Sequence, residues 1–454
     1  MGSYLSSTDH QQKAMLDEIG YKDYDDLFGC VPDSVKLKGR LSIPEGKSEL
    51  ELRRQMESLA GKNRVFDHVF RGAGAYRHYI PAIVKEVVSK EEFVTAYTPY
   101  QAEISQGNLQ AIFEYQTMIC ELTGMDAANA SVYDGASAAA ESVFMCRERG
   151  ASAAAESVFM CRERKRVRVL AADTANPDVL AAMETYCHGR GAHVELVPSK
   201  DGSVDLEALK EMLDETTACF YVQQPNYYGI LEEVTAMAEL VHGAGARLIA
   251  GCNPISMAVL QTPAECGADI AVGEGQPLGL PMAFGGPYLG FMATTRDMMR
   301  KLPGRIVGET VDSDGKRGFV LTLQAREQHI RREKASSNIC SNQALCALTA
   351  SVYLSAMGPE GLREAALQCT SKAHYLREKL RAAGLSPVYD KPFFHEFVTD
   401  CPADTARLSA KLEEEGYLGG LPLPGGRILW CTTEMNTKEE MDRLADLVKE
   451  VCCA

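Results

Sequence analysis

Helical and strand patterns alternate along the middle of the chain, and this alternation constrains the fold more than any other feature. Between residues 110 and 300, segments with helical apolar spacing are separated by short runs rich in β-branched residues. The strands expected are 167–171, 193–197, 218–222, 247–250 and 270–272. Strands joined through helices pair in parallel, and both faces of such a sheet are covered by helices. We therefore predict an α/β fold with a mostly parallel sheet.

The regions on either side of this central part have different patterns. Residues 1–65 are polar with a broken apolar stripe, which predicts an N-terminal helical arm. A large α/β domain is expected over 66–325. Residues 326–454 combine a long helical stretch with two further strands and two helices, which predicts a smaller C-terminal α+β domain.

Composition excludes several classes of function. The formal net charge of -15 argues against a nucleic-acid partner, because phosphates repel an acidic surface. The 15 cysteines include no Cys-x-x-Cys pair and have no histidine partners at zinc spacing, so no metal site is expected. The N-terminal residues contain no apolar stretch for a signal peptide or a membrane span. These observations predict reduced thiols, no membrane association and a cytoplasmic location.

A 15-residue segment occurs twice in succession. GASAAAESVFMCRER stands at 135–149 and again at 150–164. Fifteen more helical residues would add about 22 Å of helix, which the following strand cannot accommodate while staying in the sheet. We expect one copy to occupy the native helix and the other to loop out or to extend that helix into solvent. The sequence leaves open which copy does which.

Residues 269–291 look like the cofactor-anchoring hairpin of an enzyme that uses pyridoxal phosphate (PLP). In such a hairpin a buried strand ends in a polar turn that carries a lysine, and a Gly-rich strand leads away. Here the turn reads Gly275-Gln276-Pro277, so Pro277 stands where the lysine would be. No lysine occurs between Glu211 and Arg300. Because proline has no amine side chain, this turn cannot form a Schiff base.

Several motifs together resemble the P-protein of the glycine cleavage system in its two-subunit form. They are RGAGAYRHYIPA (71–82), YTPYQAEISQG (97–107), NASVYDGAS (129–137), QQPNYYG (223–229), GEGQPLGLPMAFGGPYLG (273–290) and REQHIRREKASSNICSNQAL (326–345). The resemblance covers the whole chain apart from the insertion and implies a fold-type I PLP-transferase-like architecture.

The resemblance also implies a division of labour between two subunits. The first subunit lacks the PLP lysine and the second holds PLP, so no cofactor is expected on this chain and no catalytic residue is expected in this chain alone. The activity implied is glycine decarboxylation with aminomethyl transfer to the lipoyl-H-protein. The implied partners are glycine decarboxylase subunit 2 and the H-protein, in an α2β2 heterotetramer.

Two further positions agree with the loss of the cofactor. A fold-type I enzyme needs an aspartate on a core strand to keep the pyridine nitrogen protonated, and alignment by eye places Ala250 at that position. Gly135 and Ser137 begin a helix where the PLP phosphate would be held, which would leave a vestigial anion site. The alternative is that this segment is only a helix N-cap.

The polar and aromatic loop 97–107 supplies the candidates for completing an active site at the subunit boundary. They are Tyr97, Tyr100, Gln101, Glu103 and Gln106. The alternative is an interface loop without substrate contact, since loops of this composition serve both purposes. His395 is expected to be a structural histidine in a half-buried strand. Two other functions stay open: a stand-alone PLP enzyme of the aminotransferase or desulfurase kind, and a non-catalytic structural partner.

Overall fold

The structure is a computed structural model that describes residues 6–39, 41–147, 166–189, 191–332, 335, 337, 339 and 342–452. The chain divides into two compact units, residues 1–65 and residues 66–454. Each is described by itself.

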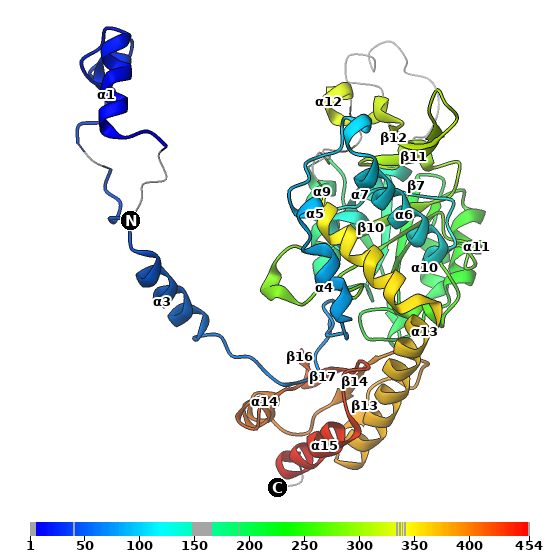
Figure 1. Ribbon diagram of the computed structural model, residues 1–454. Coiled ribbons are helices and arrows are strands. Elements are labelled where there is room, and N and C mark those ends of the chain that lie inside the picture. The colour runs from blue at the N-terminus through cyan, green and yellow to red at the C-terminus, as the bar shows by residue number, and fades with distance from the viewer. Residues whose placement is uncertain are drawn as a thin grey trace. The chain divides into compact units, whose positions relative to one another are not determined.

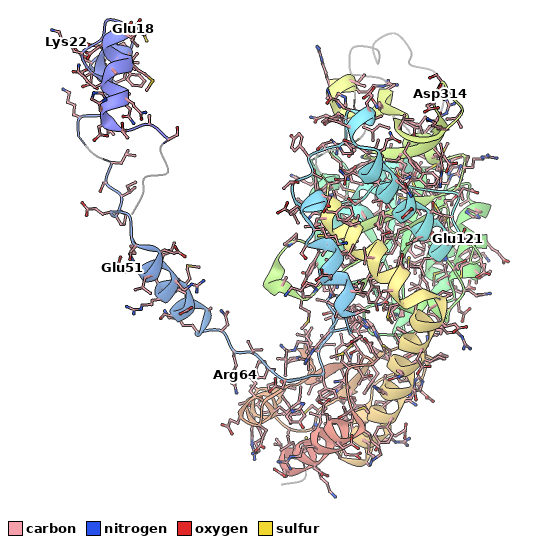
Figure 2. The ribbon with its side chains drawn as sticks, in the orientation of Figure 1. Glu18, Lys22, Glu51, Arg64, Glu121 and Asp314 are labelled. Carbon is pink, nitrogen blue, oxygen red and sulfur yellow. The ribbon has the colours of Figure 1, made fainter. Side chains whose placement is uncertain are left out.

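Within its described residues, 6–39 and 41–65, the first unit contains three helices and almost no core. They are α1 (Asp9–Glu18), α2 (Tyr24–Leu27) and α3 (Glu49–Ala60). Capping boxes at Thr8 and Ser48 start α1 and α3, because each side chain satisfies a backbone amide that the first helical turn leaves free. Figure 2 labels Glu51, which completes the box of Ser48. Leu16 is the single buried apolar residue among the described residues of this unit.

The second unit is built on a seven-stranded sheet (Figure 1) with the strand order β2-β10-β9-β8-β7-β3-β4. The strands are β2 (Ala127–Ala128), β3 (Arg168–Ala172), β4 (Val194–Val197), β7 (Thr217–Gln224), β8 (Arg247–Cys252), β9 (Ile270–Glu274) and β10 (Gly290–Thr294). Strands β9, β8, β7, β3 and β4 are parallel, whereas β10 is antiparallel to β9 and β2. All five strands predicted from the sequence are confirmed, and so is the α/β class.

Helices cover both faces of this sheet. One face packs on α7 (Gly135–Cys146) and α9 (Pro177–His188). The other packs on α6 (Gln106–Thr123), α10 (Leu206–Met212), α11 (Val234–Gly243) and the first half of α13 (Ala344–Ala382). The side chains of each strand alternate between the two apolar clusters, as a doubly covered sheet requires.

The first copy of the duplicated segment forms α7. This helix packs against β7, β8, β9, β10 and α9, so it occupies a core position in the fold. The second copy, at 150–164, lies outside the described residues.

The C-terminal part is a four-stranded sheet covered by helices. Its strands are β13 (Ser386–Pro387), β14 (Glu396–Asp400), β17 (Arg427–Cys431) and β16 (Leu421–Leu423), and its helices are the second half of α13, α14 (Thr405–Glu414) and α15 (Lys438–Cys452). Helix α13 is interrupted at Gly358, whose φ of 61° is available mainly to glycine. Its first half therefore packs on α4 and α6, and its second half packs on α15.

The remaining elements are short. They are β1 (His68–Val69), which pairs with β15 (Tyr417–Leu418), α4 (Ala82–Val88), α5 (Glu91–Val94), the β5–β6 hairpin (Ser199–Lys200 and Ser203–Val204), the β11–β12 hairpin (Ile306–Val311 and Arg317–Thr322) and α12 (Gln328–Arg331). Within the described part of the chain, none of the helices is both long enough and apolar enough to cross a membrane.

Candidate functional site

A cavity of about 360 Å³ opens at the C-terminal ends of the central parallel strands. Ligands bind at this end of open α/β sheets, because the strand ends and the helix N-termini meet there. The lining comes from the loop Gly72–Tyr76, the start of α7, the start of α9, and the ends of β7, β8 and β9. Among the described residues that line the cavity, none is lysine, arginine or histidine, whereas Asp134, Asp178 and Glu274 are acidic.

The turn after β9 lies in the wall of this cavity. Pro277, predicted at the position of the missing lysine, is one of the lining residues. Gln276 is 1% exposed and points away from solvent. Its Oε1 accepts a hydrogen bond from Tyr76 N (2.8 Å), and its Nε2 donates to Tyr76 O (2.9 Å) and Leu280 O (2.7 Å). The turn that anchors a cofactor in PLP enzymes therefore anchors a backbone loop here.

A buried carboxylate holds the same loop from the other side. Glu396 on β14 accepts hydrogen bonds from Ala73 N (2.6 Å) and the Tyr76 hydroxyl (2.9 Å). It is 4% exposed, and this burial raises the pKa of its carboxyl to about 7. Gly72 also touches Glu396 so closely that any side chain at position 72 would collide with it. The loop is thus fixed between the large sheet and the C-terminal sheet.

The N-terminus of α7 meets the end of β9 in the cavity wall. Asp134 is the N-cap, and its carboxylate accepts a hydrogen bond from Ser137 N (2.7 Å). Glu274 Oε2 accepts from Gly135 N (3.0 Å), while its Oε1 accepts from Gln276 N (2.9 Å) and Leu289 N (3.0 Å). The amides of Gly135 and Ser137, predicted as a vestigial anion site, are therefore bonded to carboxylates of the chain itself.

Ala250, predicted at the position of the lost aspartate, lies on β8. Ala250 is 2% exposed and belongs to the apolar cluster on the α6 and α11 side of the sheet. Its neighbours Gly251 and Cys252 line the cavity. A side chain at 251 would collide with the Tyr221 ring. Strand β8 therefore contributes no carboxylate to the described lining of the cavity.

The predicted loop 97–107 lies at a second cavity. Tyr97 lines this space of about 280 Å³ together with residues of α5, α6 and the start of α13. The Tyr100 hydroxyl accepts a hydrogen bond from Arg305 Nη2 (2.9 Å), and the Arg305 guanidinium lies 5.2 Å from the centre of the Tyr100 ring. Arg305 is itself 6% exposed.

The other three candidates of this loop are separate from both cavities. Gln101 and Glu103 are exposed. Gln106 is bonded to the backbone of Phe319 on β12, with its Oε1 accepting from Phe319 N (2.8 Å) and its Nε2 donating to Phe319 O (2.9 Å). None of the five candidates belongs to the first cavity, so the structure does not bring them together with Pro277 and Gly135.

Two buried histidines, His78 and His395, have rings close to that of Tyr76 in the Gly72–Tyr76 loop. His395 is 1% exposed, the centre of its ring lies 4.8 Å from that of Tyr76 with the rings tilted by 37°, and burial lowers its pKa to about 3. His78 Nδ1 lies 2.8 Å from Glu434 Oε2, to which Cys369 Sγ also donates at 3.5 Å. These three groups lie close enough together to be metal ligands. The hydrogen bonds among them account for the grouping without an ion.

Sequence reasoning missed Glu274, Gln276 and Glu396 as site residues. Glu274 was passed over because a charged residue ending an apolar strand is typical of a surface position. A carboxylate directly before the degenerate turn was the one available signal. The roles of Gln276 and Glu396 depend on partners 200 and 323 residues away, which no local pattern reveals.

Comparisons with known proteins agree over the full length of the chain. The sequence profile of the glycine cleavage system P-protein family matches residues 2–448. A protein named probable glycine dehydrogenase (decarboxylating) subunit 1 from Moorella thermoacetica is 47% identical, with 99% of each chain covered. A Bacillus cereus protein of the same name is also 47% identical, with 98% of each chain covered.

Solved structures give the same result. The crystal structure of a glycine decarboxylase (P-protein) of the glycine cleavage system, in inhibitor-bound form, has a TM-score of 0.89 at 41% identity and covers 99% of this chain and 100% of its own. The sphingosine-1-phosphate lyase of Burkholderia pseudomallei has a TM-score of 0.64 at 16% identity, covering 92% of this chain and 94% of its own, which shows the shared fold. The fold is that of the fold-type I PLP enzymes. With its matching profile and its full-length relatives, the chain belongs to the glycine cleavage system P-protein family.

Proposed function

We propose that this chain is subunit 1 of glycine dehydrogenase (decarboxylating) and acts only with a second subunit. Together the two would decarboxylate glycine and transfer the aminomethyl group to the lipoyl-H-protein. One observation carries the proposal: the cavity of a P-protein fold has proline at the lysine position of its anchoring turn. The amine that this chemistry requires must therefore come from another chain.

The residues around the cavity do not fit PLP. The described lining contains no cationic side chain, and the α7 amides at Gly135 and Ser137 are bonded to carboxylates. Strand β8 has alanine at position 250 and contributes no carboxylate to that lining. A PLP site needs an amine, an anion cradle and a carboxylate for the ring nitrogen. All three requirements fail, so we assign PLP to the partner subunit and none to this chain.

The contribution of this chain would be a scaffold and a loop. Tyr97 lines the second cavity, and Tyr100 is bonded to Arg305 of the same lining; their exposed fractions are 86% and 52%. Side chains of this size are seldom left so exposed unless they meet a ligand or another protein. We propose that they face the partner's active site in an α2β2 heterotetramer. The acidic composition and the scattered thiols support a cytoplasmic location.

The decisive experiment is glycine-dependent CO2 exchange with this chain alone, subunit 2 alone and the two mixed. Lipoyl-H-protein and PLP are present in every reaction. Activity in the mixture alone is the expected result, because neither chain would hold a complete site. Activity of this chain by itself would refute the proposal. So would an absorbance band at about 410–430 nm in the isolated chain that borohydride abolishes, since that band reports a lysine Schiff base.

A further inference from the structure

The N-terminus of α7 is the place in this fold where an anion would be bound, and it already holds one. Helix α7 has 12 residues and begins at Gly135, with its first amides directed toward the cavity wall. Such amides carry partial positive charge and bind phosphates or carboxylates. Glu274 Oε2 lies 3.0 Å from Gly135 N, which is the distance of a formed hydrogen bond.

The packing around Glu274 is built for its carboxylate. Strand β9 approaches α7 so closely that a Cβ at Gly135 would stand 2.7 Å from Glu274 N, so glycine is required at that position. The two oxygens of Glu274 accept three backbone amides, from Gly135, Gln276 and Leu289. Within the described part of the chain, no cationic side chain bonds to it. Backbone dipoles alone therefore compensate this buried charge.

We propose that Glu274 is an internal anion that replaces the cofactor phosphate at the start of α7. This inference rests on the proposed function, in which the chain carries no PLP. A missing lysine removes the covalent link to a cofactor but leaves the phosphate cradle intact. Glu274 removes the cradle as well, because its carboxyl group occupies the Gly135 amide in the folded chain.

The N-cap Asp134 also disfavours phosphate binding at the start of α7. Its carboxylate is bonded to Ser137 N, two residues from the amide that Glu274 occupies. Burial raises the pKa of Glu274 to about 7, so above that pH an incoming phosphate would meet two negative charges at one helix end. Like charges at this distance repel strongly in a buried setting. Glu274 is the residue whose carboxylate takes the phosphate position, and Asp134 strengthens the effect.

The test compares pyridoxal phosphate with pyridoxal, which differ only in the phosphate, on the isolated full-length chain. For the unaltered chain the two compounds should bind with equal and weak affinity. In Glu274→Ala, and more so in Asp134→Asn/Glu274→Ala, pyridoxal phosphate should bind about tenfold tighter or better than pyridoxal, since the freed amides accept the phosphate. Inorganic phosphate should also raise the melting temperature of these variants and leave that of the unaltered chain unchanged.

Glu232→Ala is the matched control. Glu232 is 6% exposed and accepts hydrogen bonds from Thr174, Asn226 and Val204 N, but it is not at the start of α7. Its loss should lower the melting temperature without any response to phosphate. A response equal to that of Glu274→Ala would show that phosphate acts generally on destabilised chains and would overturn the inference.

Two other results would also overturn it. One is that the unaltered chain binds pyridoxal phosphate tenfold tighter than pyridoxal, a measurement that stands even if the variants do not fold. The other is that folded Glu274→Ala shows no preference for the phosphate. None of these readouts involves glycine turnover, so a negative anion test leaves the subunit assignment intact, and a failed reconstitution is detected separately.

Discussion

Replacing Gln276 by alanine should release the loop Gly72–Tyr76 from the anchoring turn. The Gln276 side chain makes three hydrogen bonds in a site with 1% exposure, two of them to the Tyr76 backbone. Each of these three buried bonds contributes about 1 kcal/mol. The expected loss is therefore about 3 kcal/mol of local stability.

The assay is native-state hydrogen exchange of a peptide that covers residues 72–80. Tyr76 N donates directly to Gln276 Oε1, so its amide reports this contact. A loss of about 3 kcal/mol corresponds to exchange that is about a hundredfold faster, since each 1.4 kcal/mol is a factor of ten. The matched control is Gln110→Ala on α6, where an exposed glutamine bonds only to Glu114 and should change nothing at Tyr76.

An unchanged exchange rate at Tyr76 in Gln276→Ala would refute this reasoning. It would mean that the loop is held by Glu396 alone and that the turn has no clamping role. A uniform increase over the whole chain would also contradict it, because the effect should be confined to segments bonded to Gln276.

Three further predictions follow from buried charge, from the second cavity and from the duplication. The pKa of Glu396 is raised from 4.5 to about 7, so its contribution to stability is present at low pH and lost as pH rises through 7. Glu396→Gln should therefore flatten this part of a plot of melting temperature against pH. An unchanged slope would contradict the prediction. Tyr100→Phe removes the hydrogen bond from Arg305 and should lower kcat of the reconstituted complex about tenfold, with assembly intact. Full activity would show that this loop does not contribute to the active site. Deletion of residues 150–164 shortens the connection between α7 and β3 from 21 residues to six, which is an ordinary length. The circular dichroism spectrum should stay the same, and the melting temperature should be unchanged or higher. A loss of folded structure would show that the second copy is needed.

The pH argument for Glu396 includes the groups that face it. Tyr76 donates to its carboxylate, Cys431 lies beside it, and His395 Nε2 is 3.8 Å away. Burial lowers the pKa of His395 to about 3 and raises those of Tyr76 and Cys431 well above their usual values. These three groups therefore stay neutral between pH 5 and 8, and the titration in that range belongs to Glu396. Glu274, with a pKa of about 7, titrates in the same range, so its contribution to the plot of melting temperature against pH remains in Glu396→Gln.

The sheet could be predicted from sequence because its strands are buried on both faces. Val169–Ala172 and Ile270–Val272 are continuous apolar runs, so they stand out against the helices around them. The β11–β12 hairpin was not predicted, although Asp314-Gly315 at its turn is a hairpin signal. Its buried residues do not alternate with exposed ones, since Ile306 and Val307 are both buried and most of the other positions are half-buried or exposed, which hides the period of a strand.

The candidate site was predictable only where a residue type is itself decisive. Pro277 excludes a Schiff base whatever surrounds it, so that conclusion needed no coordinates. Glu274 acquires its role only when α7 and β9, which are separated by more than 120 residues, meet in space.

The first unit has a consequence for how the chain behaves in solution. Of the apolar side chains there, Ile43 and Val35 are each 70% exposed, Leu37 is 66% exposed and Phe28 is 55% exposed. Apolar surface of this extent favours association whenever nothing covers it. The isolated chain should therefore self-associate, and its sedimentation profile should depend on protein concentration. Removal of residues 1–65 should reduce this self-association.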